Sequence, residues 1–316
     1  MRLLITGGRG MVGRNLVETL QVAHDVLAPS RSELDLLDFG AVLDYLKQSD
    51  VDFIIHAAGR VGGIEVNRRN NSDFLFENAV MGLNLARAAD HHGVEDLLNL
   101  SSSCTYPADR DRAIREDELL TGSLEPTNEG YAIGKIAVQR MCHMLSLERG
   151  HRAYKTAVPC NLYGPYDKFD AVGGHMIPSA IRKVADAVEA GANDVEIWGD
   201  GTARREFMYV GDLVSFVSDA LNRWDLLPAT VNVGLGVDHT IREYYDAVAG
   251  VVGYRGRFVY DLERPVGMKR KLLDCSQVHS WGWRAQHTLE EGLSATYDYY
   301  ARTRRTELPA GDQLLG

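Results

Sequence analysis

The N-terminal segment constrains the fold of this chain more than any other stretch. A short apolar run, Leu3-Leu4-Ile5, passes directly into a glycine-rich turn that extends from Thr6 to Gly13. Apolar residues then recur at helical spacing, at Val12, Leu16 and Leu20. The pattern predicts a buried strand, a tight turn and an amphipathic helix, which together form the phosphate-binding turn of a dinucleotide site.

Each glycine of this turn has a separate role in such a site. Gly7 permits the tight turn, Gly10 lets the backbone approach a pyrophosphate, and Gly13 lets the helix pack closely on the strand. The residues that we expect to contact the cofactor here are Gly7, Arg9, Gly10, Met11, Val12 and Gly13.

Two basic residues indicate which dinucleotide is bound. The second strand, Asp25 to Ala28, leads to Arg31, where an NAD enzyme of this architecture usually has an acidic residue for the ribose diol. Arg9 and Arg31 together can hold a 2′-phosphate, which favours NADP(H) over NAD. The alternative is that both arginines are ordinary solvated surface charges.

Strands and helices alternate as far as residue 164. The predicted order is strand 53–59, helix 72–92, strand 96–100, helix 131–147 and strand 153–160. Such alternation predicts the α/β class with a Rossmann-type doubly wound parallel sheet. Ala57 and Ala58 end one strand at the sheet edge where a cofactor lies. We therefore assign residues 1–164 to an NADP-binding domain.

Beyond residue 164 the elements become shorter. Helices are expected at about 178–189, 212–222 and 240–252, with a strand at about 195–198. We assign residues 165–316 mainly to a smaller C-terminal α/β substrate domain, from which the chain returns in part to the first domain.

Tyr131 and Lys135 form a candidate acid/base pair, because residues four apart lie on the same face of a helix. A nearby ammonium favours the phenolate, so we expect Lys135 to lower the pKa of Tyr131 toward the range in which a general acid works. Taken alone, the spacing is also that of an ordinary helix with a half-buried tyrosine and a solvated lysine.

Charge and cysteine usage exclude other classes of protein. The chain has 34 Lys and Arg against 44 Asp and Glu, a net charge of −10, so nucleic acid is not an expected partner. No apolar run is long enough to span a membrane. Neither a zinc site nor any other metal site is predicted, and a reducing cytoplasm is expected, because the cysteines lack paired spacing. They are Cys104, Cys142, Cys160 and Cys275.

Several motifs follow one another along nearly the whole chain. They are Arg9-Gly10-Met11-Val12-Gly13, Val61-Gly62-Gly63-Ile64, Ser102-Ser103-Cys104-Thr105-Tyr106-Pro107, Glu125-Pro126-Thr127-Asn128-Glu129, Asn161-Leu162-Tyr163-Gly164-Pro165, Arg205-Glu206-Phe207 and Lys271-Leu272-Leu273-Asp274. With these motifs the chain resembles the extended short-chain dehydrogenase/reductases that act on nucleotide sugars, and among them the GDP-L-fucose synthase family.

The resemblance implies a role for each candidate site residue. It matches Ser102, Tyr131 and Lys135 to a reductase triad, and Cys104 and His175 to the acid and base of an epimerisation. The implied contacts with NADP(H) add Lys135, Asn161, Leu162 and His175 to the glycine turn, Arg31, Ala57 and Ala58. The implied contacts with a GDP-linked 4-keto-6-deoxy sugar are Asn161, Lys183, Trp198, Arg205 and Lys271.

The implied reaction is the NADPH-dependent 3,5-epimerisation and 4-reduction of GDP-4-keto-6-deoxy-D-mannose to GDP-L-fucose. A ketone at C4 acidifies the hydrogens at C3 and C5, so one group can remove them and a second can return a proton to the opposite face. A thiol and an imidazole suit this work because they titrate closer to neutrality than a serine or a lysine. Without the resemblance, Cys104 and His175 would be interpreted as structural residues.

Other functions fit parts of the pattern. The same chemistry could act on another GDP-4-keto sugar such as a heptose, or the chain could be a redox-neutral nucleotide-sugar 4-epimerase with tightly held NAD. A catalytically silent NADP-binding regulator is the alternative outside enzymes. The resemblance also implies a homodimer that forms through helices of the cofactor domain.

Overall fold

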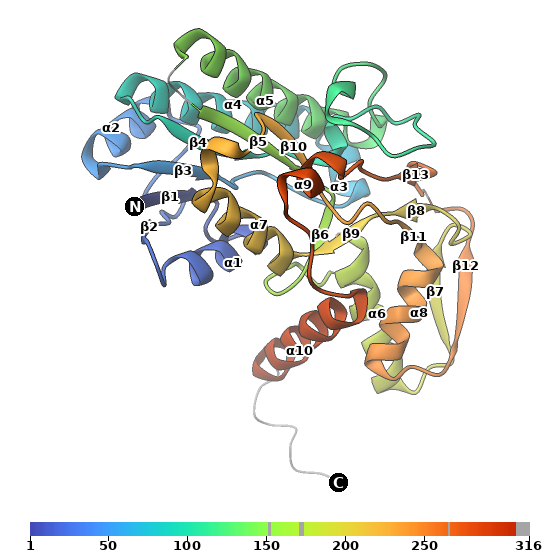
Figure 1. Cartoon of the computed structure of the whole chain (residues 1–316). Helices are drawn as coiled ribbons and strands as arrows, with labels where there is room; N and C mark the ends of the chain where they lie inside the picture. The colour runs from blue at the N-terminus through green and yellow to red at the C-terminus, as the bar shows by residue number, and fades with distance from the viewer. Residues whose placement is uncertain (151–152, 171–173, 265, 308–316) are drawn as a thin grey trace.

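The computed structural model describes residues 1–150, 153–170, 174–264 and 266–307. Its larger part is a six-stranded sheet with helices on both faces, and its smaller part carries the last helix of the chain (Figure 1). The arrangement confirms the predicted α/β class, with a doubly wound parallel sheet and a smaller C-terminal α/β unit.

Every pair of neighbouring strands in the large sheet is parallel. In spatial order the strands are β10 (Thr230–Val233), β5 (Ala153–Pro159), β4 (Asp96–Leu100), β3 (Phe53–His56), β1 (Arg2–Thr6) and β2 (Asp25–Leu27). The chain runs outward in opposite directions from β1 and β3, and Thr6 pairs with His56 in register. The carboxyl ends of these two strands therefore form the crevice in which ligands of doubly wound folds bind.

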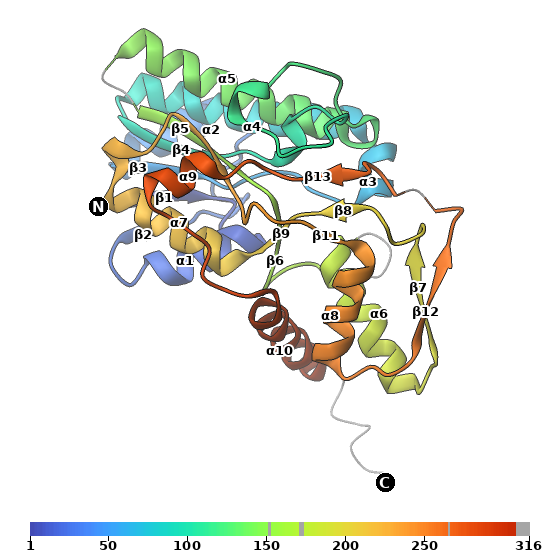
Figure 2. The same ribbon diagram turned by 45° about the vertical axis from the view of Figure 1, so that its right-hand side comes forward.

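Helices cover both faces of this sheet (Figures 1 and 2). One layer consists of α2 (Phe39–Ser49), α4 (Asn71–His92) and α5 (Glu129–Arg149), and the other contains α1 (Met11–Leu20) and α7 (Val210–Asn222). Leu4 and Ile54 pack with the first layer, whereas Leu3 and Ile55 pack with the second. Because successive side chains of a strand alternate between faces, strands covered on both sides are apolar throughout.

The smaller part has its own apolar cluster, which includes Ile181, Ile197 and Tyr244. Its elements are α6 (Met176–Ala190), α8 (Ile241–Val252), α10 (Leu289–Glu307) and the parallel pair β7 (Asp194–Trp198) and β12 (Arg257–Asp261). Short ladders lie between the two parts (Figure 2). They pair β6 (Asn161–Tyr163) with β9 (Phe207–Tyr209), and β8 (Arg204–Arg205) with both β11 (His239–Thr240) and β13 (Arg270–Lys271).

The chain passes between the two parts more than once. After β5 it enters the smaller part, and it comes back through α7 to β10 at the edge of the large sheet. A second return runs through α9 (Ser276–Trp281), which packs against β10. Residues from the second half of the sequence therefore lie beside the large sheet.

The start of α5 is pressed against the start of α4. The Gly130 amide donates to the Asn71 side chain at 2.8 Å, and a Cβ on Gly130 would lie 2.0 Å from the Asn71 carbonyl oxygen. A larger residue would force the two helices apart, because protein interiors leave no space for an added methyl group. The packing fixes the position of Tyr131, the next residue, beside the edge of the sheet.

Two further observations limit the kind of site that the fold can hold. No helix among the described residues is long and apolar enough to cross a membrane. The histidine, cysteine and acidic side chains of the same residues form no cluster of three that could bind a metal ion. The four cysteines have free thiols.

Candidate active site

The turn after β1 has the geometry that a dinucleotide requires. Gly7 has a φ of +75°, and a Cβ there would lie 2.7 Å from the backbone of Ala58. A Cβ on Gly13 would lie 2.1 Å from the Gly7 carbonyl oxygen, whereas one on Gly10 would meet only that oxygen, at 3.4 Å. Among the described residues, no side chain caps the start of α1. The turn and the first N–H groups of α1 thus fit a pyrophosphate.

Arg9 and Arg31 lie at the exposed rim of this turn. The charge of Arg9 reaches the Glu33 carboxylate, two residues beyond Arg31. Arg31 is 72% exposed, and its Nε is 4.0 Å from Asp35. Two guanidinium groups in this position can accept a 2′-phosphate. The predicted contacts of Arg9 and Arg31 with NADP(H) stay predictions.

Ser102 and Cys104 follow the end of β4. Ser102 precedes a single 3-10 turn, η1 (Ser103–Thr105), and its Oγ accepts a hydrogen bond from the Cys104 amide at 3.3 Å. The Ser102 side chain also contacts the thiol of Cys104 and the phenol of Tyr131. The fold thus brings three of the predicted catalytic side chains together at one edge of the sheet.

Tyr131 and Lys135 project from the first turns of α5. Burial, aided by the charge of Cys104, raises the pKa of Tyr131, and the hydrogen bond with Ser102 only partly opposes this. The Lys135 ammonium donates to the carbonyl oxygens of Leu100, at 3.1 Å, and Ala58, at 3.4 Å, and burial lowers its pKa to about 8. The prediction that Lys135 lowers the pKa of Tyr131 is therefore wrong, because the ammonium faces two strand ends. The catalytic role of the pair stays a prediction.

The sulfur of Cys104 faces two hydrogen-bond donors. Lys271 Nζ lies 3.0 Å from Sγ, and Asn128 Nδ2 lies 3.2 Å from it. Burial opposes ionisation, yet the charge of Lys271 and the hydrogen bonds from Lys271, Ser102 and Asn128 hold the pKa of Cys104 below its ordinary value. The site therefore favours a thiolate at Cys104.

His175 precedes α6 and faces a buried carboxylate. Its Nδ1 lies 3.5 Å from Asp167 Oδ1, and the Asp167 side chain is 5% exposed. Burial disfavours the imidazolium, but Asp167 and the nearby charge of Cys104 outweigh it, so the pKa of His175 is raised. The surroundings thus shift His175 toward the imidazolium and Cys104 toward the thiolate.

The residues predicted to contact the sugar nucleotide fall into two adjacent groups. Lys183 and Arg264 lie over the Trp198 ring, at 5.2 Å and 5.0 Å from its centroid. Arg205 and Lys271 are ladder partners in β8 and β13, and Arg205 donates to the Val266 carbonyl at 3.0 Å. The segment that carries Arg264 and Val266 therefore links the two groups, and residue 265 within it lies outside the described residues.

Asn161 and Leu162 lie in β6, next to β9. The Asn161 side chain donates to the backbone carbonyl of Glu206 at 2.8 Å, and Leu162 pairs with Met208. Asn161 thus helps to position the residue that follows Arg205, while its predicted contacts with cofactor and substrate stay predictions, as does the cofactor contact of Leu162.

The sequence did not predict Asn128, which contacts the sulfur of Cys104, or Asp167, which faces His175. Asn128 stands three residues before Tyr131, so its place at the start of the same helix was a usable signal. Asp167 offers no such signal, since an acidic residue in a loop after a glycine and a proline is ordinarily solvated.

Three comparisons place the chain among known proteins. The model of the NAD dependent epimerase/dehydratase family matches residues 3–234. A GDP-L-colitose synthase of Yersinia pseudotuberculosis is 49% identical over 308 residues, which cover 97% of this chain and 100% of that protein. A GDP-L-fucose synthase of Azorhizobium caulinodans is 44% identical over 300 residues, covering 95% of this chain and 96% of that one. The solved structure of a GDP-mannoheptose C4 reductase from Campylobacter jejuni with NADP bound has a TM-score of 0.84 and 28% identity, covering 95% of this chain and 98% of the other.

Proposed function

Because the chain belongs to the NAD dependent epimerase/dehydratase family, we propose that it converts GDP-4-keto-6-deoxy-D-mannose to GDP-L-fucose by 3,5-epimerisation and 4-reduction. It is an NAD(P)-dependent epimerase/reductase of the GDP-L-fucose synthase type. The observation that carries the proposal is a second acid/base pair, Cys104 and His175, beside the reductase residues Tyr131 and Ser102.

The electrostatics of this second pair support a role for each residue. Lys271 and Asn128 favour the thiolate of Cys104, so Cys104 is the base that removes the hydrogen next to the C4 ketone. Asp167 favours the imidazolium of His175, so His175 is the acid that returns a proton to the opposite face. The enolate that forms between these steps carries its charge on the C4 oxygen, where Ser102 and Tyr131 donate hydrogen bonds.

Reduction then uses the first pair. Because Tyr131 keeps its proton at neutral pH, it serves as the acid that protonates the C4 oxygen. Ser102 orients the same oxygen. The glycine turn, Arg9 and Arg31 would hold NADPH, which would supply the hydride for C4. Lys135, whose ammonium donates to carbonyls at the ends of β3 and β4, would bond the nicotinamide ribose.

Incubation of the purified protein with GDP-4-keto-6-deoxymannose and NADPH tests the proposal. We expect one NADPH oxidised for each ketone consumed, and an L-sugar product identified by NMR. If NADPH is oxidised but the product keeps the D configuration, the protein is a 4-reductase without epimerase activity. Absence of oxidation would contradict the proposal, and NAD retained after purification would favour the redox-neutral 4-epimerase.

A second candidate substrate lacks the 3-hydroxyl. Identity is higher to the GDP-L-colitose synthase, at 49%, than to the GDP-L-fucose synthase, at 44%. Colitose is fucose without its 3-hydroxyl, so C3 is no stereocentre and only C5 needs inversion. Competition between the two 4-keto sugars, with a GDP-keto-heptose as the third arm, would separate the candidates by their kcat/KM values.

A further inference from the structure

Lys271 places its ammonium in the interior of the active site. The residue is 7% exposed, and its Nζ lies 3.0 Å from the sulfur of Cys104. Among the described residues, that sulfur is the one acceptor within hydrogen-bonding distance of Nζ. An ammonium withdrawn from water is stable only beside a compensating anion or several strong acceptors. A neutral thiol is a poor acceptor, whereas a thiolate provides the missing charge.

A second contact points to the same charge state. Asn128 also directs its amide nitrogen at the sulfur, at 3.2 Å. The ammonium and the amide nitrogen are donors only, so both of these contacts require lone pairs on the sulfur. A thiol that kept its hydrogen would have to direct it away from two converging donors. Both donors find an acceptor without this conflict when the thiol has lost its hydrogen.

We propose that Lys271 is a positioning residue that keeps Cys104 in its thiolate form. The proposal deepens the proposed function, because the thiolate is the base of the epimerisation there. It gives Lys271 a role that does not depend on a bound nucleotide. Lys271 has three N–H donors, so a contact with the sulfur leaves others for a substrate phosphate.

The backbone around Lys271 is held on both sides, which keeps the ammonium in place. Arg270 donates to Asp238 Oδ2 at 2.5 Å and to the carbonyl of Asp111 at 2.8 Å. On the other side, the amide of Leu273 donates to the buried carboxylate of Glu206 at 2.9 Å. Lys271 therefore lies between two anchored residues.

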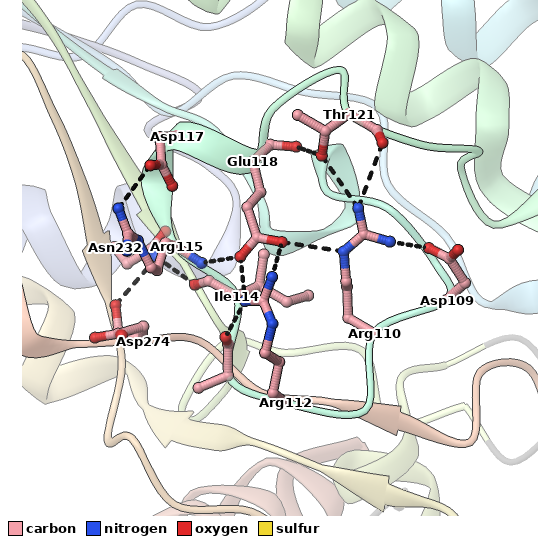
Figure 3. Close-up of polar contacts among 11 residues, drawn as sticks. Asp109, Arg110, Arg112, Ile114, Arg115, Asp117, Glu118, Thr121, Asn232 and Asp274 are labelled. Atoms are coloured by element: carbon pink, nitrogen blue, oxygen red, sulfur yellow. Dashed lines mark hydrogen bonds and ion pairs between the residues drawn. The ribbon is translucent and has the colours of Figure 1, made fainter.

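The loop from Asp109 to Thr121 completes this support (Figure 3). Ile114 forms a bridge with Leu273, and the Asn232 side chain donates to the carbonyls of Ile114, at 2.9 Å, and Asp274, at 3.1 Å. Within the loop, the Glu118 carboxylate accepts hydrogen bonds from Arg110, Arg112 and the amide of Arg115. The hydrogen bond from Arg112 and these other donors lower the pKa of Glu118 to about 2, so the loop keeps its anionic centre at neutral pH.

Alkylation by iodoacetamide tests the proposal without any substrate. Cys142, Cys160 and Cys275 are 0%, 5% and 3% exposed, whereas Cys104 is half-buried, so the reagent reaches Cys104 first. We expect Lys271→Met to slow alkylation of Cys104 at neutral pH about tenfold and to shift its pH profile upward. Lys271→Arg restores the charge and should keep most of the reactivity.

The matched control is Lys269→Ala. Lys269 is exposed and lies two residues from Lys271, so this variant removes one positive charge from the same segment without touching the thiol. We expect its alkylation profile to match that of the parent. A Lys271→Met profile that also matches the parent would overturn the proposal.

A second measurement covers the case in which Lys271→Met does not fold. The ultraviolet absorbance of the thiolate, recorded against pH for the parent and for Cys104→Ser, gives the titration of Cys104 in the intact protein. A midpoint below the ordinary thiol range supports the proposal, and a midpoint at or above it overturns it. If Lys271→Met slows alkylation of Cys104 but NADPH is not oxidised with any GDP-keto sugar, the proposed function fails while the role of Lys271 stands.

Discussion

The two candidate acid/base groups are assembled from different parts of the fold. Tyr131 and Lys135 share one helix, and the ammonium binds carbonyls at the ends of β3 and β4 within the large parallel sheet. Cys104 instead accepts a hydrogen bond from Lys271, which is 167 positions away in sequence, and its proposed partner His175 stands at the start of α6. One group belongs to the large sheet and its helices, while the other forms only when both parts of the chain meet.

The two groups also differ in charge. Burial raises the pKa of Tyr131, so its phenol favours the neutral form that the proposed reduction step requires. Lys271 and Asp167 instead favour an ionised thiol and a protonated imidazole. In the proposed function, charges from the C-terminal part of the chain add epimerisation to the reductase site, so the two reactions should respond differently to substitution.

Tyr131→Phe should impair mainly the first group and give the largest effect, because Ser102 still donates to the enolate oxygen of the epimerisation. Without the phenolic proton, NADPH oxidation should fall about 1,000-fold, the middle of the range for general acid catalysis. Exchange of deuterium from solvent into the sugar should fall far less. Stopped-flow absorbance measures NADPH oxidation, and NMR measures deuterium exchange. An equal loss of both rates would show that the two groups do not act separately.

Cys104→Ser should break the second group. A serine hydroxyl is a far weaker base than a thiolate, so deuterium exchange should fall about 100-fold. Reduction of the ketone without epimerisation should persist, and NMR would detect the product of the unchanged D configuration. Loss of reduction to the same extent would remove Cys104 from its assigned role.

Asp167→Asn should change the pH profile of deuterium exchange and leave that of NADPH oxidation unchanged. Exchange needs the thiolate and the imidazolium together, so its rate should rise as Cys104 loses its proton and fall as His175 loses its own. Asp167 helps to raise the pKa of His175 above the ordinary value of 6.5, so the variant should move the alkaline limb downward. The pH profile of NADPH oxidation, in which Tyr131 is the proposed acid, should not move.

Asn232→Ala should have the smallest effect on rate. Asn232 is fully buried and bonds Tyr106, Ile114 and Asp274, so its loss should lower the free energy of unfolding by about 2 kcal/mol. Exchange should fall several-fold with little change in reduction. Urea unfolding measures the stability, and Asn193→Ala, at an exposed position, is the matched control.

Local patterns were sufficient to predict the large sheet and the first acid/base group. The glycine turn from Gly7 to Gly13 and the buried strands carry their own periodicity, and Tyr131 with Lys135 is a spacing within one helix. Strand β10 was missed, although β2 and β3, which are no longer, were predicted. Helix α10 was missed because its apolar face is narrow and lies among many charged residues.

The second group could be named only through family resemblance. Nothing in the local sequence of Cys104 predicts that Lys271 will face it, because the contact depends on the Ile114–Leu273 bridge and the ladder of β8 with β13. The pKa of Tyr131 was predicted wrongly for a related reason. Spacing along a helix places two side chains on one face, but it does not reveal that nearby carbonyls attract the ammonium.

The independence of the two reactions is tested most directly by measuring both in one sample. Parent, Tyr131→Phe and Cys104→Ser are incubated with GDP-4-keto-6-deoxymannose and NADPH in deuterium oxide, and carbon-bound deuterium is compared with NADPH oxidised. We predict a high ratio of deuterium to oxidation for Tyr131→Phe and a low ratio for Cys104→Ser, with the parent between them. Equal ratios in the two variants would contradict the account.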